Sequence, residues 1–362
     1  MSKMLVHICC SVDSHFFLQR LQKEYGKELV GYFYDPNIHP YSEYRLRFLD
    51  VQRSCQKLGI PLLEGPYDYE SWLEAVRGLE KEPEKGARCM VCFDKRLKNA
   101  ARKAKELGIQ HYTTTLLVSP LKSQEQLKKS AKAVDKELGT KFLFVDYRSG
   151  GGTQEQARVT KEQQLYRQDY CGCLFGLSLQ REAKNQLMDE MICAVDKQIL
   201  PASIEERLTL YQKRMVLEEK GIEYTIIRKR FLNYRLLRGF VRVQKTVVPS
   251  YILSYSHLRR EYAKAKIEYI HQGIGYANRD EIRVAELRWL NRLLQTNFAT
   301  TKELYFKGLD QNQQMRVRQE IDENIYSLSP IIVLDKIPQK FEIHIEATSY
   351  KDVKEELILK DG

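Results

Sequence analysis

The chain has 362 residues, of which 43% are hydrophobic and 30% charged, and its net charge is +11. This length and apolar share are sufficient for two folded domains, and no apolar run reaches the roughly 20 residues of a membrane-spanning helix. The excess of basic residues favours an anionic partner. The composition therefore predicts a globular protein of two domains that has no membrane partner.

The first apolar run, MLVHICC at 4–10, ends in two cysteines and is followed by Asp13, which is unlike a secretion signal. We therefore expect a cytoplasmic protein. Thiols stay reduced in that compartment, so structural disulfides are not expected.

Residues 1–178 alternate between short apolar runs and amphipathic stretches. The predicted strands are 5–9, 28–34, 61–64, 112–117 and 141–146, and the predicted helices are 16–21, 42–58 and 123–138. This alternation predicts an α/β domain with a doubly wound, mostly parallel sheet. Ligands of such sheets bind beyond the carboxyl ends of the strands. The glycine-rich stretch 148–154 lacks the spacing of a phosphate-binding loop and is interpreted as a mobile lid or a flexible connector.

Residues 179–362 differ in character and predict a second, α+β domain. Its expected helices are 180–197, a helix that begins with a capping box of Ser203 and Glu206 and ends at Gly221, then 281–294 and 311–323. Its expected strands are 223–231, 236–248, 331–334 and 341–345. The stretch from Tyr211 to Arg260 contains 12 Lys and Arg but only three Glu, and Tyr and Phe lie between the basic residues. Such a composition suits binding to a nucleic-acid phosphate backbone and to unstacked bases. The solvated face of an ordinary basic protein has the same composition, however.

Six of the eight cysteines form three close pairs. The pairs are Cys9 with Cys10, Cys89 with Cys92, and Cys171 with Cys173. In a reduced chain, close pairs indicate metal binding, and structural zinc, a [4Fe-4S] cluster and a dithiol redox relay are all compatible with them. Cys55 and Cys193 are expected to be small buried hydrophobic residues.

The number of candidate ligands indicates more about the metal centres than their spacing does. One four-ligand centre would leave two thiolates and the nearby Asp13 without a function. Thiolates with a carboxylate form a mixed ligand set that iron can use with a position left open. We therefore expect a second metal beside the first.

With these residues assembled, the first half of the chain resembles the QueH type of epoxyqueuosine reductase. The matching motifs are HICCSVDS at 7–14, YFYDPNIHPYSEYRLR at 32–47, EPEKGARCMVCFDKRL at 82–97, TTTLLVSPLKS at 113–123, DYR at 146–148 and YRQDYCGC at 166–173. The resemblance implies a cytoplasmic oxidoreductase that removes the epoxide oxygen of epoxyqueuosine in tRNA, the last step of queuosine biosynthesis. It also implies a fold like that of PP-loop nucleotide-binding enzymes and a [4Fe-4S] cluster beside a mononuclear iron.

The resemblance also assigns residues to the site. The implied metal ligands are Cys9, Cys10, Asp13, Cys89, Cys92, Cys171 and Cys173. Asp13 with Cys9 or Cys10 is expected on the lone iron, and the rest of the partition stays open. The catalytic set is completed by His39 and Tyr34 as candidate proton donors. The implied substrate-binding residues are Asn37, Glu43, Tyr44, Arg45, Thr114, Thr115, Ser119 and Lys122.

The implied partners are a tRNA that carries epoxyqueuosine at the wobble position and an external electron donor. We expect the extra domain, 179–362, to bind this tRNA, with a stabilising or dimerising role as the alternative; the oligomeric state stays open. Two other functions compete. An iron–sulfur PP-loop tRNA thiolase has the loop Ser-Gly-Gly-x-Asp-Ser after its first strand, where this chain has Cys9-Cys10-Ser11-Val12-Asp13-Ser14. The glycines that let phosphates approach the backbone are absent, so nucleotide binding is disfavoured. A non-catalytic, zinc-stabilised RNA-binding protein is the other.

Overall fold

The computed structural model describes residues 3–26, 28–120, 122–322, 324 and 326–360. The chain forms two compact units, and neither is continuous in sequence. Unit 1 contains the chain up to Ile192, residues 207–226 and the C-terminal end from Leu357. Unit 2 contains residues 193–206 and 227–356. No helix in the described part is both long enough and apolar enough to cross a membrane.

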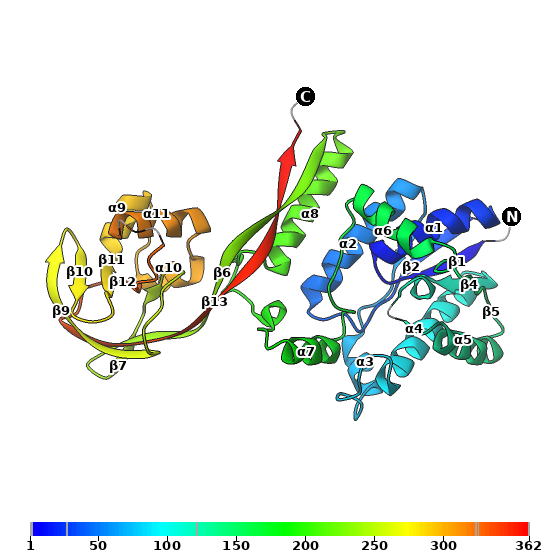
Figure 1. Cartoon of the computed structure of the whole chain (residues 1–362), viewed down its shortest axis with the longest axis horizontal. Helices are drawn as coiled ribbons and strands as arrows, with labels where there is room; N and C mark the ends of the chain where they lie inside the picture. Colours follow the sequence, from blue (N-terminus) through cyan, green and yellow to red (C-terminus); the bar gives the residue numbers. More distant parts are fainter. Residues whose placement is uncertain (1–2, 27, 121, 323, 325, 361–362) are drawn as a thin grey trace. The chain divides into compact units, whose positions relative to one another are not determined.

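Unit 1 is built on a five-stranded sheet in which all described pairings are parallel and the order is β3-β2-β1-β4-β5. Its strands are β1 (Met4–Ile8), β2 (Leu29–Phe33), β3 (Leu62–Glu64), β4 (His111–Thr114) and β5 (Lys141–Phe142). Its helices include α1 (Ser11–Tyr25), α2 (Tyr41–Leu58), α3 (Tyr69–Ala75), α4 (Ala87–Glu106), α5 (Gln124–Leu138), α6 (Gly152–Glu162) and α7 (Leu174–Ala183). Figure 1 shows α1, α2 and α6 on one face of the sheet and α4 and α5 on the other. The predicted doubly wound α/β fold is confirmed.

The central strand β1 is buried along its whole length, as a strand covered by helices on both faces must be. Its one polar residue, His7, is satisfied by its neighbours: Nδ1 lies 2.8 Å from Thr114 Oγ1 and Nε2 lies 3.0 Å from the Tyr34 carbonyl oxygen. Burial lowers the pKa of His7 to about 3, so the ring is neutral and ties β1 to both adjacent strands at their carboxyl ends.

Unit 2 is dominated by an eight-stranded sheet in the order β7-β6-β13-β9-β10-β11-β12-β8. The strands are β6 (Tyr224–Val243), β7 (Thr246–Val248), β8 (Tyr251–Ile252), β9 (Tyr262–His271), β10 (Ile274–Ala277), β11 (Arg283–Glu286), β12 (Ile331–Leu334) and β13 (Lys340–Leu359). Three helices, α9 (Leu287–Leu294), α10 (Thr301–Lys307) and α11 (Gln311–Ile321), complete it. The second α+β domain is confirmed, and β6, β13 and α8 (Ile204–Glu219) belong in part to both units.

Several predicted elements of the second half are wrong in extent. The helix expected at 180–197 ends at Ala183, because Asn185 takes a left-handed backbone with a φ of 48°. The strands expected at 223–231 and 236–248 are mostly one strand, β6, and the first residues of the helix expected at 281–294 form β11. Residue 323, the expected end of the last helix, lies outside the described residues. Cys55 is buried as predicted, but Cys193 is exposed.

Candidate metal and substrate site

The carboxyl ends of the central strands of unit 1 meet at one edge of the sheet. Ile8 of β1 pairs with Phe33 of β2, and His7 pairs with Thr114 of β4. Cys9, Tyr34 and Thr115 follow these strands directly, so the backbone topology brings them to the edge where ligands of such sheets bind.

Cys9, Cys10 and Asp13 form a compact group at the start of α1. Cys9 Sγ lies 3.8 Å from Cys10 Sγ and 3.6 Å from Asp13 Oδ2. One ligand atom from each of the three residues lies within 4.8 Å of the other two, which is close enough for all three to bind one metal ion. Cys10 is the N-cap of α1 and Asp13 lies in its first turn, where the positive end of the helix dipole favours negative ligands.

Two further residues position this group. Gln156 of α6 is buried, and its Nε2 donates a 2.8 Å hydrogen bond to Asp13 Oδ1. Thr115 Oγ1 accepts a 3.3 Å hydrogen bond from the Cys9 backbone N–H and lies 3.5 Å from Cys9 Sγ. Burial raises the pKa of Asp13, which means that an uncompensated carboxylate is costly here and that a cation would lower that cost.

Gln156 occupies its position because α6 begins within the stretch that we interpreted as a flexible connector. Gly152 starts this helix, and a Cβ added there would lie 1.9 Å from the Tyr147 carbonyl oxygen. Only glycine allows the chain to pass so close to that carbonyl. The interpretation of the whole stretch as a connector is therefore wrong at its C-terminal end.

The other two cysteine pairs come from α4 and from the turn before α7. Cys89 and Cys92 lie one turn apart near the start of α4. Between Cys171 and Cys173, Gly172 has a φ of 98°, and a Cβ there would lie 2.8 Å from Ile38 Cγ1. This glycine allows the tight turn expected of the C-G-C sequence. Cys92, Cys171 and Cys173 share one apolar cluster.

Two cations lie among these cysteines. Burial lowers the pKa of Lys122, but the nearby Cys171 and Cys89 outweigh it, so the net shift is upward. Arg96, one turn after Cys92 on α4, is buried, is salt-bridged to Asp35 and interacts with Cys92 and Cys9. A hydrogen bond with Cys173 holds the pKa of Cys171 well below its usual range. Burial raises the pKa of Cys92, and hydrogen bonds with Cys9 and Cys171 raise the pKa values of Cys10 and Cys173. The environment therefore favours the thiolate, the form that binds metals, at Cys171, whereas these three thiols would ionise on binding a metal.

The donor set fits the two metal groups that the sequence predicts. Four thiolates on one zinc ion would lie about 3.8 Å apart, because a Zn–S bond is about 2.3 Å long. Among the described residues, no three of Cys89, Cys92, Cys171 and Cys173 have sulfurs that all lie within 4.8 Å of one another. A thiolate-ligated cluster spreads its four cysteines over several irons, so it does not require their sulfurs to lie that close together.

Buried polar atoms without partners lie along the loop that follows β2. They are Asp35 Oδ2, Asn37 Oδ1 and His39 Nδ1. The backbone N–H of His39 donates 2.9 Å to the Gly172 carbonyl oxygen, which holds this loop against the second cysteine turn. Buried polar groups are normally paired, so these three unpaired atoms are candidates to bind a polar ligand.

The structure does not bring every candidate catalytic or substrate-binding residue to the metal-binding group or to the unpaired atoms of the loop after β2. The Tyr34 hydroxyl donates to Asp68, Glu43 is buried against Arg47 and Tyr166, and the Tyr44 hydroxyl donates to Glu64. Arg45 forms a half-exposed ion pair with Glu64, Thr114 is bonded to His7, and Ser119 is buried in the loop before Lys122. A substrate role for these residues stays a prediction.

Two residues of the site were not among the candidates. Arg96 could have been found, because it lies four positions after Cys92 on a predictable helix face. Gln156 has no local signal, since its contact with Asp13 depends on how α6 packs against α1.

Comparison with known proteins identifies the family. A solved U34-tRNA thiolase from Methanococcus maripaludis with its [4Fe-4S] cluster aligns over 53% of this chain and 76% of its own, with 14% identity and a TM-score of 0.26. The family model described as epoxyqueuosine reductase QueH matches residues 4–179. The epoxyqueuosine reductase QueH of Thermotoga maritima is 34% identical over 185 residues, which cover 50% of this chain and 94% of that protein.

The epoxyqueuosine reductase QueH of Helicobacter pylori matches far more of the chain. It is 38% identical over 354 residues, which cover 93% of this chain and 95% of the relative. The similarity therefore extends through unit 2, which the Thermotoga maritima protein does not match. The site and these relatives lead to one conclusion: the chain belongs to the epoxyqueuosine reductase QueH family of oxidoreductases.

Proposed function

We propose that this protein reduces epoxyqueuosine in tRNA to queuosine. Removal of the epoxide oxygen as water consumes two electrons, which an external donor supplies, and two protons. The observation that carries the proposal is the group of Cys9, Cys10 and Asp13 at the ligand-binding edge of the sheet, in a chain whose relatives are named epoxyqueuosine reductases. The expected setting is the cytoplasm, where these thiols would remain reduced.

We assign the two metal groups to different parts of the site. Cys89, Cys92, Cys171 and Cys173 would hold a [4Fe-4S] cluster, and Cys9, Cys10 and Asp13 would hold one iron. When bound, these groups would supply single electrons and a Lewis acid for the epoxide oxygen. The seven side chains account for every paired cysteine and for the aspartate.

The protein's own residues then have distinct roles. Gln156 fixes the orientation of the Asp13 carboxylate, and the positive charges of Lys122 and Arg96 lie among the thiols that would ionise on metal binding. Asn37 and His39 offer unpaired buried atoms to the polar groups of the substrate. Burial lowers the pKa of His39, so its ring is neutral at pH 7 and holds the substrate by hydrogen bonding. Of the two candidate proton donors, His39 and Tyr34, Tyr34 is the weaker, because its hydroxyl already donates a hydrogen bond to Asp68.

An anaerobic preparation tests this function directly. The purified protein should be brown, contain about five irons per chain and convert epoxyqueuosine-containing tRNA in the presence of a chemical reductant. A colourless protein with one zinc ion and no turnover would overturn both the cofactor assignment and the reaction.

The variant Asp13→Ala separates the two metal groups. It should abolish turnover but keep most of the cluster absorbance, because Asp13 is not a ligand of the cluster in this assignment. Cys193→Ser is the matched control, since this thiol is exposed and belongs to unit 2. Loss of the cluster absorbance in the Asp13 variant would show that the partition is wrong.

A further inference from the structure

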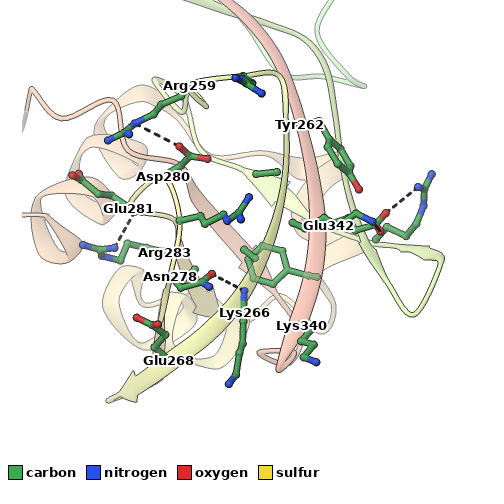
Figure 2. Close-up of a pocket in the computed structure, with 18 of the residues that line it drawn as sticks. Arg259, Tyr262, Lys266, Glu268, Asn278, Asp280, Glu281, Arg283, Lys340 and Glu342 are labelled. Atoms are coloured by element: carbon green, nitrogen blue, oxygen red, sulfur yellow. Dashed lines mark hydrogen bonds and ion pairs between the residues drawn. The ribbon is translucent and has the colours of Figure 1, made fainter.

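Unit 2 contains a broad hollow of about 1290 Å³ over its sheet, shown in Figure 2. Its lining comes from β6 and the turn after it, from β9 and the loop before it, from β13, and from the turn between β10 and β11 with the strand ends beside it. Nine of the lining side chains are Lys or Arg and four are acidic. The hollow is therefore the place where part of the net positive charge of the chain is concentrated.

The basic side chains of the hollow are only partly neutralised. Arg242 and Lys264 pair with Glu342, and Arg259 pairs with Asp280. Within the described residues, six lining cations form no ion pair. Arg283 is half-buried and donates to the Glu281 carbonyl oxygen. The other five are Lys245, Arg260, Lys266, Arg279 and Lys340. All five are exposed, so their charges are available to a ligand.

The pairing of β9 with β13 places two of these charges directly opposite each other. Lys340 pairs with Lys266 in the antiparallel register, whereas Glu342 pairs with Lys264 two residues further along. Opposite charges in such cross-strand positions stabilise a sheet, and like charges destabilise it. The pair Lys266–Lys340 is thus unfavourable for the folded protein by itself, and a bound anion would remove the penalty.

A β-bulge adds Arg279 to the same end of the hollow. The register between β9 and β10 shifts at Tyr276 and Ala277, and Asn278 then bonds to the backbone of Lys266 in both directions: its side chain accepts from the N–H and its own N–H donates to the carbonyl oxygen. Figure 2 shows Asn278 in contact with Lys266, with Lys340 on the adjacent strand. This local geometry holds the turn that carries Arg279 beside the two lysines.

The basic stretch between Tyr211 and Arg260 contributes only some of its charges to this surface. Arg235 is buried, and Arg228 and Lys229 form ion pairs with Glu355 and Glu356. Arg242 and Lys245 do line the hollow. Arg259 and Arg260 of the same stretch also line it, and the other unpaired exposed charges come from β9, from β13 and from the turn after β10, which lie outside that stretch.

We propose that this hollow binds the phosphate backbone of the substrate tRNA; the proposal rests on the proposed function. Several unpaired cations spread over a wide, open surface match a row of phosphates better than one small anion, which would need a closed cradle. Tyr262 at the rim is 43% exposed and offers a ring for stacking with a base or ribose. Because the contacts are to phosphates, the surface distinguishes RNA by charge and shape, not by base sequence.

Two triple variants with the same change in charge test the proposal. The first is Lys266→Gln, Arg279→Gln and Lys340→Gln. The control is Arg292→Gln, Lys302→Gln and Arg316→Gln, which are exposed residues of α9, α10 and α11 outside the hollow. The affinity of the full-length protein for epoxyqueuosine-containing tRNA is measured by fluorescence anisotropy at several salt concentrations.

The first variant should bind tRNA on the order of tenfold more weakly at low salt, and its slope of log K against log[salt] should fall by about 2. The control should bind as the wild type does. Equal losses in both variants would show that only net charge matters, and unchanged binding in the first would show that the hollow is not used; either result overturns the proposal.

The single variant Lys340→Glu separates binding from folding. It places an acidic side chain opposite Lys266, so the melting temperature should be equal to or above that of the wild type, while tRNA binding weakens. Binding of this variant as tight as that of the wild type would contradict the proposal. The wild-type reductase assay is run in parallel, so failure of the reaction and failure of the binding surface are recorded independently.

Discussion

Asp13 is positioned by Gln156, a side chain that lies 143 residues further along the chain. The amide of Gln156 donates to Oδ1, which leaves Oδ2 facing Cys9 Sγ at 3.6 Å. A carboxylate ligand needs such a partner, because an unrestrained side chain would lose rotamer freedom on binding a metal. The hydrogen bond therefore pre-orients the carboxylate.

Replacement of Gln156 by leucine should lower turnover roughly 10- to 100-fold, the usual cost of losing a partner of a metal ligand. The cluster absorbance should remain, and the loss should be accompanied by reduced occupancy of the lone iron. Iron analysis and the anaerobic tRNA assay measure both. Gln154→Leu is the control, because Gln154 lies on the same helix and is exposed. Equal activity of the two variants would exclude this positioning role.

At the scale of elements, α8 is bound to α2 through a buried network of charges. Arg53 of α2 donates to Glu218 of α8 at 2.9 and 3.0 Å, and Arg214 of α8 lies 3.5 Å from Asp50 of α2. Both arginines also donate 3.0 Å hydrogen bonds to the Gln163 carbonyl oxygen. Buried charges are tolerated only in such paired arrangements, so each helix depends on the other for its partners.

The pH dependence of stability should report this network. Burial raises the pKa of Glu218, but hydrogen bonds from Arg53 and Tyr224 outweigh it and bring the value to about 2, below the ordinary 4.5. A carboxylate with a depressed pKa stabilises the folded state above its unfolded pKa and loses this contribution as the pH falls through the folded pKa. Glu218→Gln should therefore lower the free energy of unfolding by up to about 3 kcal/mol at pH 7, and the difference should vanish towards pH 2.

Urea unfolding between pH 7 and pH 2 measures this difference. The exposed neighbour Glu219 offers a control of equal charge, and Glu219→Gln should change stability little at any pH. A constant difference between Glu218→Gln and the wild type over the whole range would show that ionisation of Glu218 is not involved.

At the scale of the molecule, each unit is assembled from segments that are separate in the sequence. Residues 207–226 lie well beyond the family match at 4–179 but belong to unit 1, and they carry Arg214 and Glu218. The boundary that the sequence suggests, after residue 178, would therefore cut through the charge network between α2 and α8. A shortened protein must keep these residues.

Two shortened proteins make this testable. Truncation after residue 178 should lower the melting temperature and the urea midpoint, because Arg53 and Asp50 lose their buried partners. A second protein lacks 227–356 and joins Ile226 to Leu357 by an Asn-Gly turn, since these residues lie on the adjacent strands β6 and β13, where Lys360 N–H donates to the Glu223 carbonyl oxygen. The second protein should be clearly more stable than the first, and equal stability would contradict the role of α8.

The sequence by itself determined the parts that depend on local pattern and residue type. The alternation of apolar runs and amphipathic stretches predicted the parallel sheet of unit 1, because the periodicity of a strand or helix is encoded in neighbouring residues. The three cysteine pairs and Asp13 indicated a metal site, since soft thiolates and a carboxylate suit few functions other than metal binding, and their assignment as ligands stays a prediction. The ordered motifs of the first half indicated the family.

Only the tertiary structure decided the contacts between residues that are distant in sequence. Gln156 reaches Asp13, Glu218 reaches Arg53, and Lys340 stands opposite Lys266, and no local periodicity contains these pairs. The same reason explains why the basic composition of 211–260 was an incomplete guide to the basic surface: the strand pairing decides which charges are neutralised. Register and packing, not composition, determine which lysines and arginines remain free to bind an anion.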